Sequence, residues 1–176
     1  MVAIKNIFCF ITAVTAATIY QRTPATILTD ITTIDTNVKA LTTAVDNYNG
    51  GFFNLLTVSS TESTLETSIK NAAKDAANTS QLSSADSNSV LDEINHLIPD
   101  IQEALNALVA KKSTFANAGV ASTVESDLAN LKQETDAFGK NLLAISSSDV
   151  EPKLSAALST IDNDFTNAQT AFSGGS

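Results

Sequence analysis

The sequence is poor in the residue types on which most catalytic and metal sites depend. Its 176 residues include one cysteine, one histidine and no tryptophan. Cys9 lies near the N-terminus and His96 is the only histidine. Cysteine–histidine catalysis, most zinc sites and any histidine-rich metal site are therefore excluded, because they need several such groups together. The six glycines lack the spacing of a phosphate-binding loop. We therefore expect no enzyme, no metal and no cofactor.

Positive charge is also scarce. The chain has ten Lys and Arg residues against 19 Asp and Glu residues, which gives a net charge of −9 at pH 7. Binding to nucleic acid requires clustered basic side chains, and here they are scattered along the sequence. The composition therefore argues against nucleic acid as a partner, and equally against electrostatic docking on anionic lipid.

Long apolar runs are absent, apart from a short one near the N-terminus. Lys5, an apolar core of about eight residues and small side chains at residues 15–18 have the layout of a secretory signal peptide, which we place at residues 1–17. A membrane-spanning helix needs about 20 apolar residues, so no transmembrane segment is expected. The prediction is a secreted protein, extracellular or associated with the cell wall; a buried first helix is the alternative.

The remaining residues, 18–176, are predicted to form one domain. No cysteine is left in this part of the chain, so no disulfide can support it, and the hydrophobic core must supply its stability. A domain of about 160 residues is long enough for this, because it buries roughly 70% of the surface that its unfolded chain exposes.

The dominant pattern is an apolar residue at every third or fourth position, which marks one face of a helix. From Ile27 to Tyr48, and again from Val124 to Ile145, the steps alternate between four and three. Short polar or glycine-containing turns separate the stripes, so neighbouring helices must be antiparallel. We predict an all-α fold, a single antiparallel bundle of about five helices with an apolar cavity between them. The stripes cover residues 27–48, 55–76, 90–109, 124–145 and 150–172.

Several residues predict where the helices begin, end or bend. Thr23 and Pro24 suit the N-cap and the first position of the first helix, and the glycines at residues 50–51 suit its end. The segment Ser122–Glu125 fits a capping box at the start of the fourth long helix. Pro99 lies inside the third stripe, so this helix is expected either to be kinked or to be two separate helices.

Three local motifs have both a functional and a structural interpretation. Glu93 and His96 have the Glu-x-x-His spacing of di-iron bundles, but such a site needs the motif twice, so both are expected to flank the buried seam. Thr135 occupies an apolar slot, where its hydroxyl either bonds back to its own helix or faces a cavity and a polar head group. Asn78 begins the Asn-Thr-Ser sequon and is a candidate glycosylation site.

The stripes also suggest which residues surround a cavity. Small residues opposite long side chains can leave a space that takes apolar guests, or they can let the helices pack closer. These small residues are Ala72, Ala73, Ala76, Ala157 and Ala168. The candidate ligand-binding residues are Leu41, Val45, Leu65, Ile69, Ile94, Leu97, Ile101, Leu105, Leu128, Leu131, Thr135, Phe138, Leu142, Ala157, Leu158, Ile161 and Phe165.

The first stripe and its ending carry a resemblance to a known family. The features are the opening Ile27–Ile31, its continuation Ile34–Leu41, the ending Ala44–Gly51, four further stripes without cysteine, and a tail near Ala171–Phe172. Together they resemble the fungal hydrophobic surface binding protein A family, which includes cell-wall galactomannoproteins. The resemblance covers essentially the whole chain after the signal peptide.

This resemblance implies a compact five-helix bundle with one of two functions. The first is to hold long-chain fatty acids or similar lipids in a cavity, as related mannoprotein domains do. The second is to adsorb to hydrophobic surfaces and recruit a secreted hydrolase such as a cutinase. A glycosylated wall protein without a small ligand is a third interpretation. The chain ends at Ser176 with neither a Ser/Thr-rich stalk nor a lipid-anchor signal, which favours a freely secreted protein.

Overall fold

The computed structural model describes residues 22–173, so the predicted signal peptide lies outside the described part. Within these residues the chain is helical, and the only β pairing is an isolated bridge between Arg22 and Thr79. The predicted all-α class is confirmed. The helices are α1 (Pro24–Asp46), α2 (Phe52–Ala77), α3 (Ser84–Ala110), α4 (Lys112–Asn117), α5 (Ala121–Ile145) and α6 (Glu151–Ser173).

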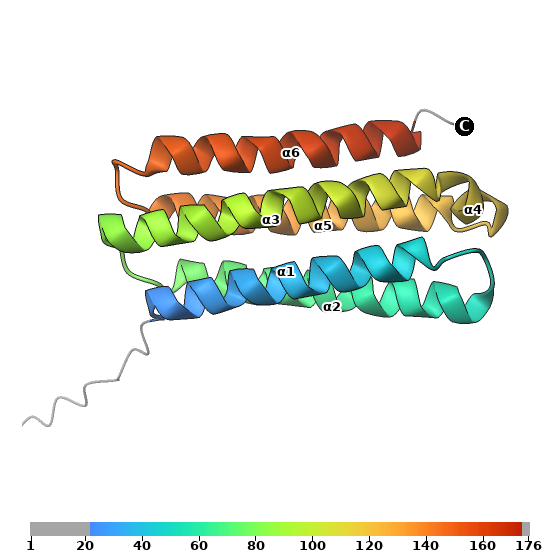
Figure 1. The fold of residues 1–176 in the computed structure, drawn as a ribbon, viewed down its shortest axis with the longest axis horizontal. Coiled ribbons are helices and arrows are strands. Elements are labelled where there is room, and N and C mark those ends of the chain that lie inside the picture. Colours follow the sequence, from blue (N-terminus) through green and yellow to red (C-terminus); the bar gives the residue numbers. More distant parts are fainter. Residues whose placement is uncertain (1–21, 174–176) are drawn as a thin grey trace, which may run out of the picture.

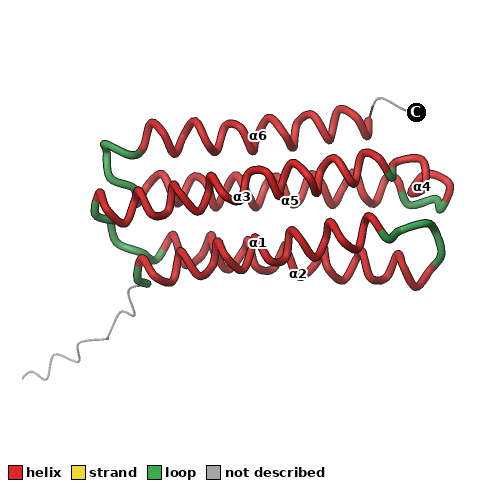
Figure 2. The backbone as a smooth tube through the Cα atoms, in the orientation of Figure 1, coloured by secondary structure: helices red, strands yellow, loops and turns green. Residues whose placement is uncertain are grey.

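The five long helices form a closed ring. α1 packs between α2 and α3, α5 packs between α2 and α6, and α6 completes the ring by packing on α3. Figure 1 shows the ring in three levels, with α1 and α2 below, α3 and α5 in the middle and α6 on top. All connections lie at the two ends of the bundle (Figure 2). The predicted stripes face inwards and form one continuous core.

The ends of α1 agree with the sequence prediction. The Thr23 hydroxyl accepts a hydrogen bond from the backbone N–H of Thr26 (3.3 Å), and Pro24 is the first helical residue. Gly50 and Gly51 follow the helix with φ angles of 94° and 92°, a backbone region that side chains with a Cβ avoid. These two residues turn the chain directly into α2.

One predicted helix boundary is wrong, and one open alternative is decided. Ser122 does not cap α5, because the helix already begins at Ala121 with Val120 as its N-cap and no side-chain cap bond. The left-handed Gly119 (φ 74°) places Val120 so that its N–H donates to the carbonyl of Phe115 (3.0 Å), which starts the helix early. Of the two alternatives at Pro99, two separate helices are ruled out, since α3 is one continuous helix that includes this proline.

The short helix α4 was not predicted, and it closes one end of the bundle. Its Phe115 side chain is fully buried and stacks on Tyr48, with ring centroids 4.7 Å apart and planes inclined by 14°. This contact ties the α1–α2 connection to the α3–α5 connection. We call this part of the molecule, formed by residues 47–51 and 111–120, the α4 end.

The opposite end, formed by residues 78–83 and 146–150, is sealed by hydrogen bonds. The Leu82 N–H donates to the carbonyl of Ile145 (2.7 Å), and the Ser147 N–H donates to the hydroxyl of Ser87 (2.9 Å). Nearby, the Asn141 amide donates to the carbonyl of Ala73 (2.8 Å) and links α5 to α2. The loops at this end are therefore held against the helices.

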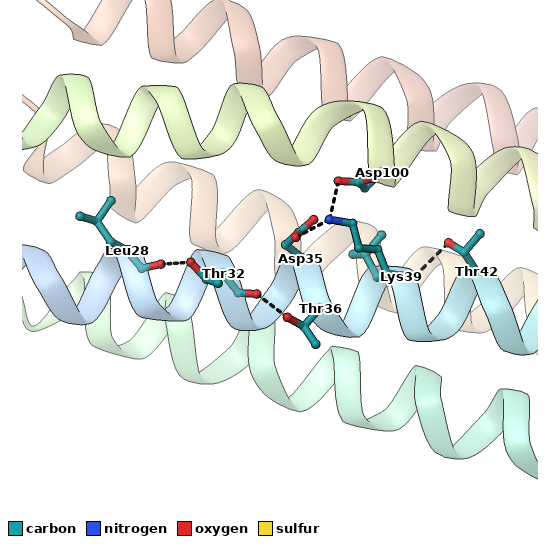
Figure 3. A network of polar contacts seen from close by, with 8 residues as sticks. Leu28, Thr32, Asp35, Thr36, Lys39, Thr42 and Asp100 are labelled. Carbon is teal, nitrogen blue, oxygen red and sulfur yellow. Dashed lines mark hydrogen bonds and ion pairs between the residues drawn. The ribbon is translucent and has the colours of Figure 1, made fainter.

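The many threonines of α1 are satisfied locally (Figure 3). The hydroxyls of Thr32, Thr36 and Thr42 each donate to a backbone carbonyl four residues earlier, at 2.9 to 3.0 Å. On the same helix, the Lys39 ammonium lies 2.7 Å from Asp35 and 3.3 Å from Asp100 of α3. This contact joins α1 to α3.

None of the described helices has a stretch long and apolar enough to cross a membrane.

The packing of α5 on α6 depends on Gly139, which faces Leu158 so closely that a Cβ there would lie 3.2 Å from the Leu158 Cδ2 atom. We expect Gly139→Leu to lower the free energy of unfolding by about 1–3 kcal/mol, because it overpacks this contact. Gly139→Ala should be close to neutral, since a gain of about 1 kcal/mol in helix propensity offsets the tighter contact. Urea unfolding followed by circular dichroism measures both changes.

The matched control is Ala137→Leu, at an exposed position of the same helix, which should change the stability by less than about 0.5 kcal/mol. An equally small effect of Gly139→Leu would contradict the close α5–α6 approach.

Candidate functional site

An apolar cavity of about 250 Å³ opens at the α4 end of the bundle. It lies between α1, α2, α3 and α5, and α6 takes no part in it. Most of its lining is aliphatic or aromatic, and none of the lining residues is Lys, Arg or His. The residues are Leu41, Phe52, Leu55, Leu56, Val58, Ser59, Glu62, Leu108, Val120, Thr123, Val124, Asp127, Leu128 and Leu131. We call this space the end cavity.

A narrower apolar seam of about 40 Å³ lies inside the ring, with side chains from all five long helices around it. Leu41, Leu108 and Leu131 line both the seam and the end cavity, so the two spaces meet at these three leucines. A buried apolar cavity of about 150 Å³ already binds benzene. The end cavity alone is larger than that, and the seam extends the apolar surface towards the middle of the bundle.

Most of the predicted ligand-binding residues lie on these two spaces. Leu128 lines the end cavity. The seam is lined by Leu41, Leu65, Ile69, Ile94, Leu97, Ile101, Leu105, Leu131, Thr135, Phe138, Leu158, Ile161 and Phe165 of the predicted set, and also by Ile34, Val38, Ala104 and Leu108. The apolar stripes predicted these positions because a residue that faces the core of a ring of helices also faces the ring's axis, where the seam lies.

Three predicted residues, Val45, Leu142 and Ala157, are buried but line neither space. Small size did not locate the cavity either. The alanines of α2 at residues 72, 73 and 76 are buried and line neither space, and the carbonyl of Ala73 accepts a hydrogen bond from α5.

The sequence prediction missed the polar residues of the end cavity, Ser59 and Glu62 from α2 and Thr123 and Asp127 from α5. One of them carried a signal. Glu62 follows the buried Val58 by four positions and precedes the buried Leu65 by three, so it occupies an apolar slot of the second stripe. Thr135 was noted in the sequence for the same reason, as a polar residue in an apolar slot.

The two acids of the end cavity, Glu62 and Asp127, both have a raised pKa. Burial raises the pKa of Glu62 from 4.5 to about 7, and the nearby charges of Asp127 and Glu66 add to this, against a smaller opposing effect of Lys70. Burial also raises the pKa of Asp127, with a further contribution from Glu66. Two neighbouring carboxyl groups in an apolar site do not both ionise readily, and Glu62 exchanges its proton near neutral pH.

Thr135 lines the seam, which fits the interpretation that its hydroxyl faces a cavity. It also borders a more polar groove between α5 and α6. Among the described residues its hydroxyl has no hydrogen bond to its own helix, in contrast to the α1 threonines such as Thr42. It is the one hydroxyl on the otherwise apolar lining of the seam.

Three large apolar side chains at the rim of the end cavity face solvent. Phe52, Phe53 and Leu56 are 72%, 81% and 56% exposed, and the two phenylalanine rings pack edge to face with centroids 5.7 Å apart. Phe52 and Leu56 also line the cavity, whereas Phe53 does not. The apolar surface is therefore continuous from the interior to the outside of the α4 end. We call these three residues the apolar rim.

The sequon lies at the opposite end of the molecule. Asn78 is the C-cap of α2 and is exposed to solvent. Its side-chain amide donates to the carbonyl of Lys74 (2.7 Å), and the Thr79 hydroxyl donates to the carbonyl of Asp75 (2.8 Å). A glycan at this position would be remote from the end cavity.

Solved structures similar to this chain share its fold over nearly their whole length. A crystal structure of AfMp4p in complex with palmitic acid has 38% sequence identity and a TM-score of 0.83, and the match covers 85% of this chain and 99% of AfMp4p. Ligand binding domain 2 of the Penicillium marneffei MP1 protein, complexed with multiple arachidonic acids, has 17% identity, a TM-score of 0.80 and coverages of 88% and 99%.

Ligand binding domain 1 of the same MP1 protein, complexed with arachidonic acids, has 13% identity and a TM-score of 0.79, with 85% of this chain and 99% of that domain covered. At these low identities the MP1 domains show the fold alone.

No curated protein sequence matches this chain significantly. Residues 24–144 match the sequence profile of hydrophobic surface binding protein A. With more than half of its length matched to that profile, the chain belongs to the hydrophobic surface binding protein A family.

Proposed function

We propose that this protein is a non-enzymatic lipid-binding protein that holds long-chain fatty acids or similar lipids between its helices. The observation that carries this proposal is that the end cavity and the seam adjoin at Leu41, Leu108 and Leu131, which line both. The complex of the 38% identical AfMp4p with palmitic acid supports the same ligand class. The proposed ligand-binding residues are the predicted positions that line the two spaces.

The energetics favour the acyl chain as the part of the ligand that enters. Each buried CH₂ group contributes about 0.8 kcal/mol, so a long chain gains several kcal/mol even after the cost of ordering it. The end cavity accepts part of such a chain directly, whereas the seam of about 40 Å³ must widen by small helix movements. The head group then stays at the α4 end, where Ser59, Glu62, Thr123 and Asp127 supply polar atoms.

The location that fits this function is outside the cell. The predicted signal peptide at residues 1–17 directs secretion, and a protein that is extracellular or associated with the cell wall meets free lipids there. Glycosylation at Asn78 belongs to the same proposal. The exposed position of Asn78 is compatible with a glycan.

A second function, adsorption to hydrophobic surfaces, is favoured by the apolar rim. Phe52, Phe53 and Leu56 together present an exposed apolar patch at one end of an otherwise polar helix surface. Exposed patches of this kind mark interaction sites. A protein held on a polymer or wax surface by this rim could recruit a secreted hydrolase such as a cutinase. The two functions are compatible, because lipid would reach the end cavity across the same rim.

Ser59→Trp should block the end cavity and weaken fatty acid uptake roughly tenfold or more, a change of about 1.4 kcal/mol. Ser59 lines the cavity and is itself exposed to solvent, so the indole can lie over the opening with the fold intact. Native mass spectrometry of the secreted protein incubated with palmitic acid gives the bound fraction. Ser60→Trp, at the neighbouring exposed position that does not line the cavity, is the control. Equal uptake by both variants would rule out this cavity as the binding site.

Phe53→Ser should reduce adsorption to polystyrene or octyl-coated beads and leave the lipid stoichiometry unchanged, because Phe53 is exposed and lies outside the cavity lining. Burying a phenylalanine contributes about 1.5–3 kcal/mol, so the adsorption constant should fall roughly 10- to 100-fold. Depletion of the protein from solution measures it. Asn54→Ser on the same turn is the control, and adsorption of Phe53→Ser at the wild-type level would argue against the rim.

A further inference from the structure

Two carboxyl groups face one apolar space at the α4 end with no cation beside them. Glu62 from α2 and Asp127 from α5 both line the end cavity. Among the described residues neither has an ion pair, whereas the nearest ammonium group that acts on Glu62, that of Lys70, is held by Glu66 at 2.8 Å and lies 3.9 Å from Glu134. The polar part of the cavity is therefore acidic and has no counterion.

The charged groups around Glu62 come from a small set of elements. α2 packs against α1 and α5. From α5 the group that acts on Glu62 is Asp127, and from α2 itself they are Glu66 and Lys70. The paired charges of α1 face elsewhere, since Lys39 is engaged with Asp35 and with α3. The surroundings of Glu62 thus favour its protonated form.

Where Glu62 and Asp127 are both ionised, a fatty carboxylate that enters this cavity would add a third negative charge to the same apolar space. Like charges at close range in a site of low dielectric repel strongly, and the repulsion is reduced if Glu62 and the ligand share one proton, as in paired carboxyl sites. A protonated Glu62 can donate an O–H···O⁻ hydrogen bond to the ligand, and such charge-assisted bonds are short and strong.

We propose that Glu62 and Asp127 select ligands by the charge of the head group, so that a long-chain carboxylic acid is bound together with one proton while an uncharged ester of the same chain is bound without one. This inference rests on the proposed lipid-binding function and adds the head-group specificity of that site. The proton comes from solvent and forms an O–H bond on Glu62 where that carboxyl is ionised. It then lies between the Glu62 carboxyl and the ligand carboxylate, and no bond between heavier atoms changes.

The sign of the pH dependence follows from the state that holds the extra proton. The complex keeps the proton of Glu62, whereas the free protein loses it as the pH rises through a pKa of about 7. Affinity for the acid should therefore be constant well below pH 7 and should fall above it, by up to roughly tenfold per pH unit for one linked proton. Affinity for the uncharged ester should not fall in this way.

The experiment compares cis-parinaric acid with its methyl ester, because the polyene fluorescence of both reports binding at concentrations below those at which they aggregate. Dissociation constants are measured from pH 6 to pH 9 for the wild-type protein, for Glu62→Gln and for Glu103→Gln. Glu103 is an exposed acid of α3 that lines neither space, so its variant loses the same charge elsewhere.

We expect the acid to lose affinity above pH 7 with the wild-type protein and with Glu103→Gln, and to show a flat profile with Glu62→Gln. Asp127→Asn, which removes the neighbouring negative charge, should move the midpoint of the profile to lower pH. A flat profile for the acid with the wild-type protein, while the ester binds, would overturn this inference and leave the lipid-binding function intact. Failure of both ligands to bind at any pH would overturn both.

Discussion

The closure of five helices into one ring is the constraint on which the rest of the structure depends. For cylinders about 10 Å across, a ring of four leaves a central gap of about 2 Å radius, whereas a ring of five leaves about 3.5 Å. Leu, Ile and Phe side chains from all five long helices fill this gap down to a seam of about 40 Å³. At the α4 end, where α6 does not contribute, the filling stops short and about 250 Å³ stays open.

Polar contacts between neighbouring helices hold the ring in register. Each such contact lies at the exposed or half-buried edge of a helix pair and contributes little to stability, but together they link neighbouring helices around the ring. The pairs are Lys39 with Asp100, Lys70 with Glu134, Lys132 with Asp162, and Gln102 with Asp164. They join α1 to α3, α2 to α5, α5 to α6 and α3 to α6, and none of them uses the two acids of the end cavity.

Much of this fold could be predicted from the sequence, because steps of three and four place a residue on one helix face whatever its neighbours do. The stripes therefore identified the five long helices and most of the seam. The end cavity could not be predicted in the same way, since it depends on how the five helices are staggered along the axis. The boundary at Ser122 was wrong for a local reason, the left-handed Gly119. Glu62 was overlooked although it interrupts an apolar stripe as visibly as Thr135 does.

The opposite end of the molecule shows that the same ring can be sealed. There the α2 alanines at residues 72, 73 and 76 are buried, and backbone hydrogen bonds hold the loops. At the α4 end an unfilled cavity, two exposed phenylalanines and an acid in an apolar slot occur within a few turns of α2. Each of these features costs stability, and departures from local packing rules tend to gather at functional sites. Their concentration around the opening of the cavity is therefore best explained by ligand binding there.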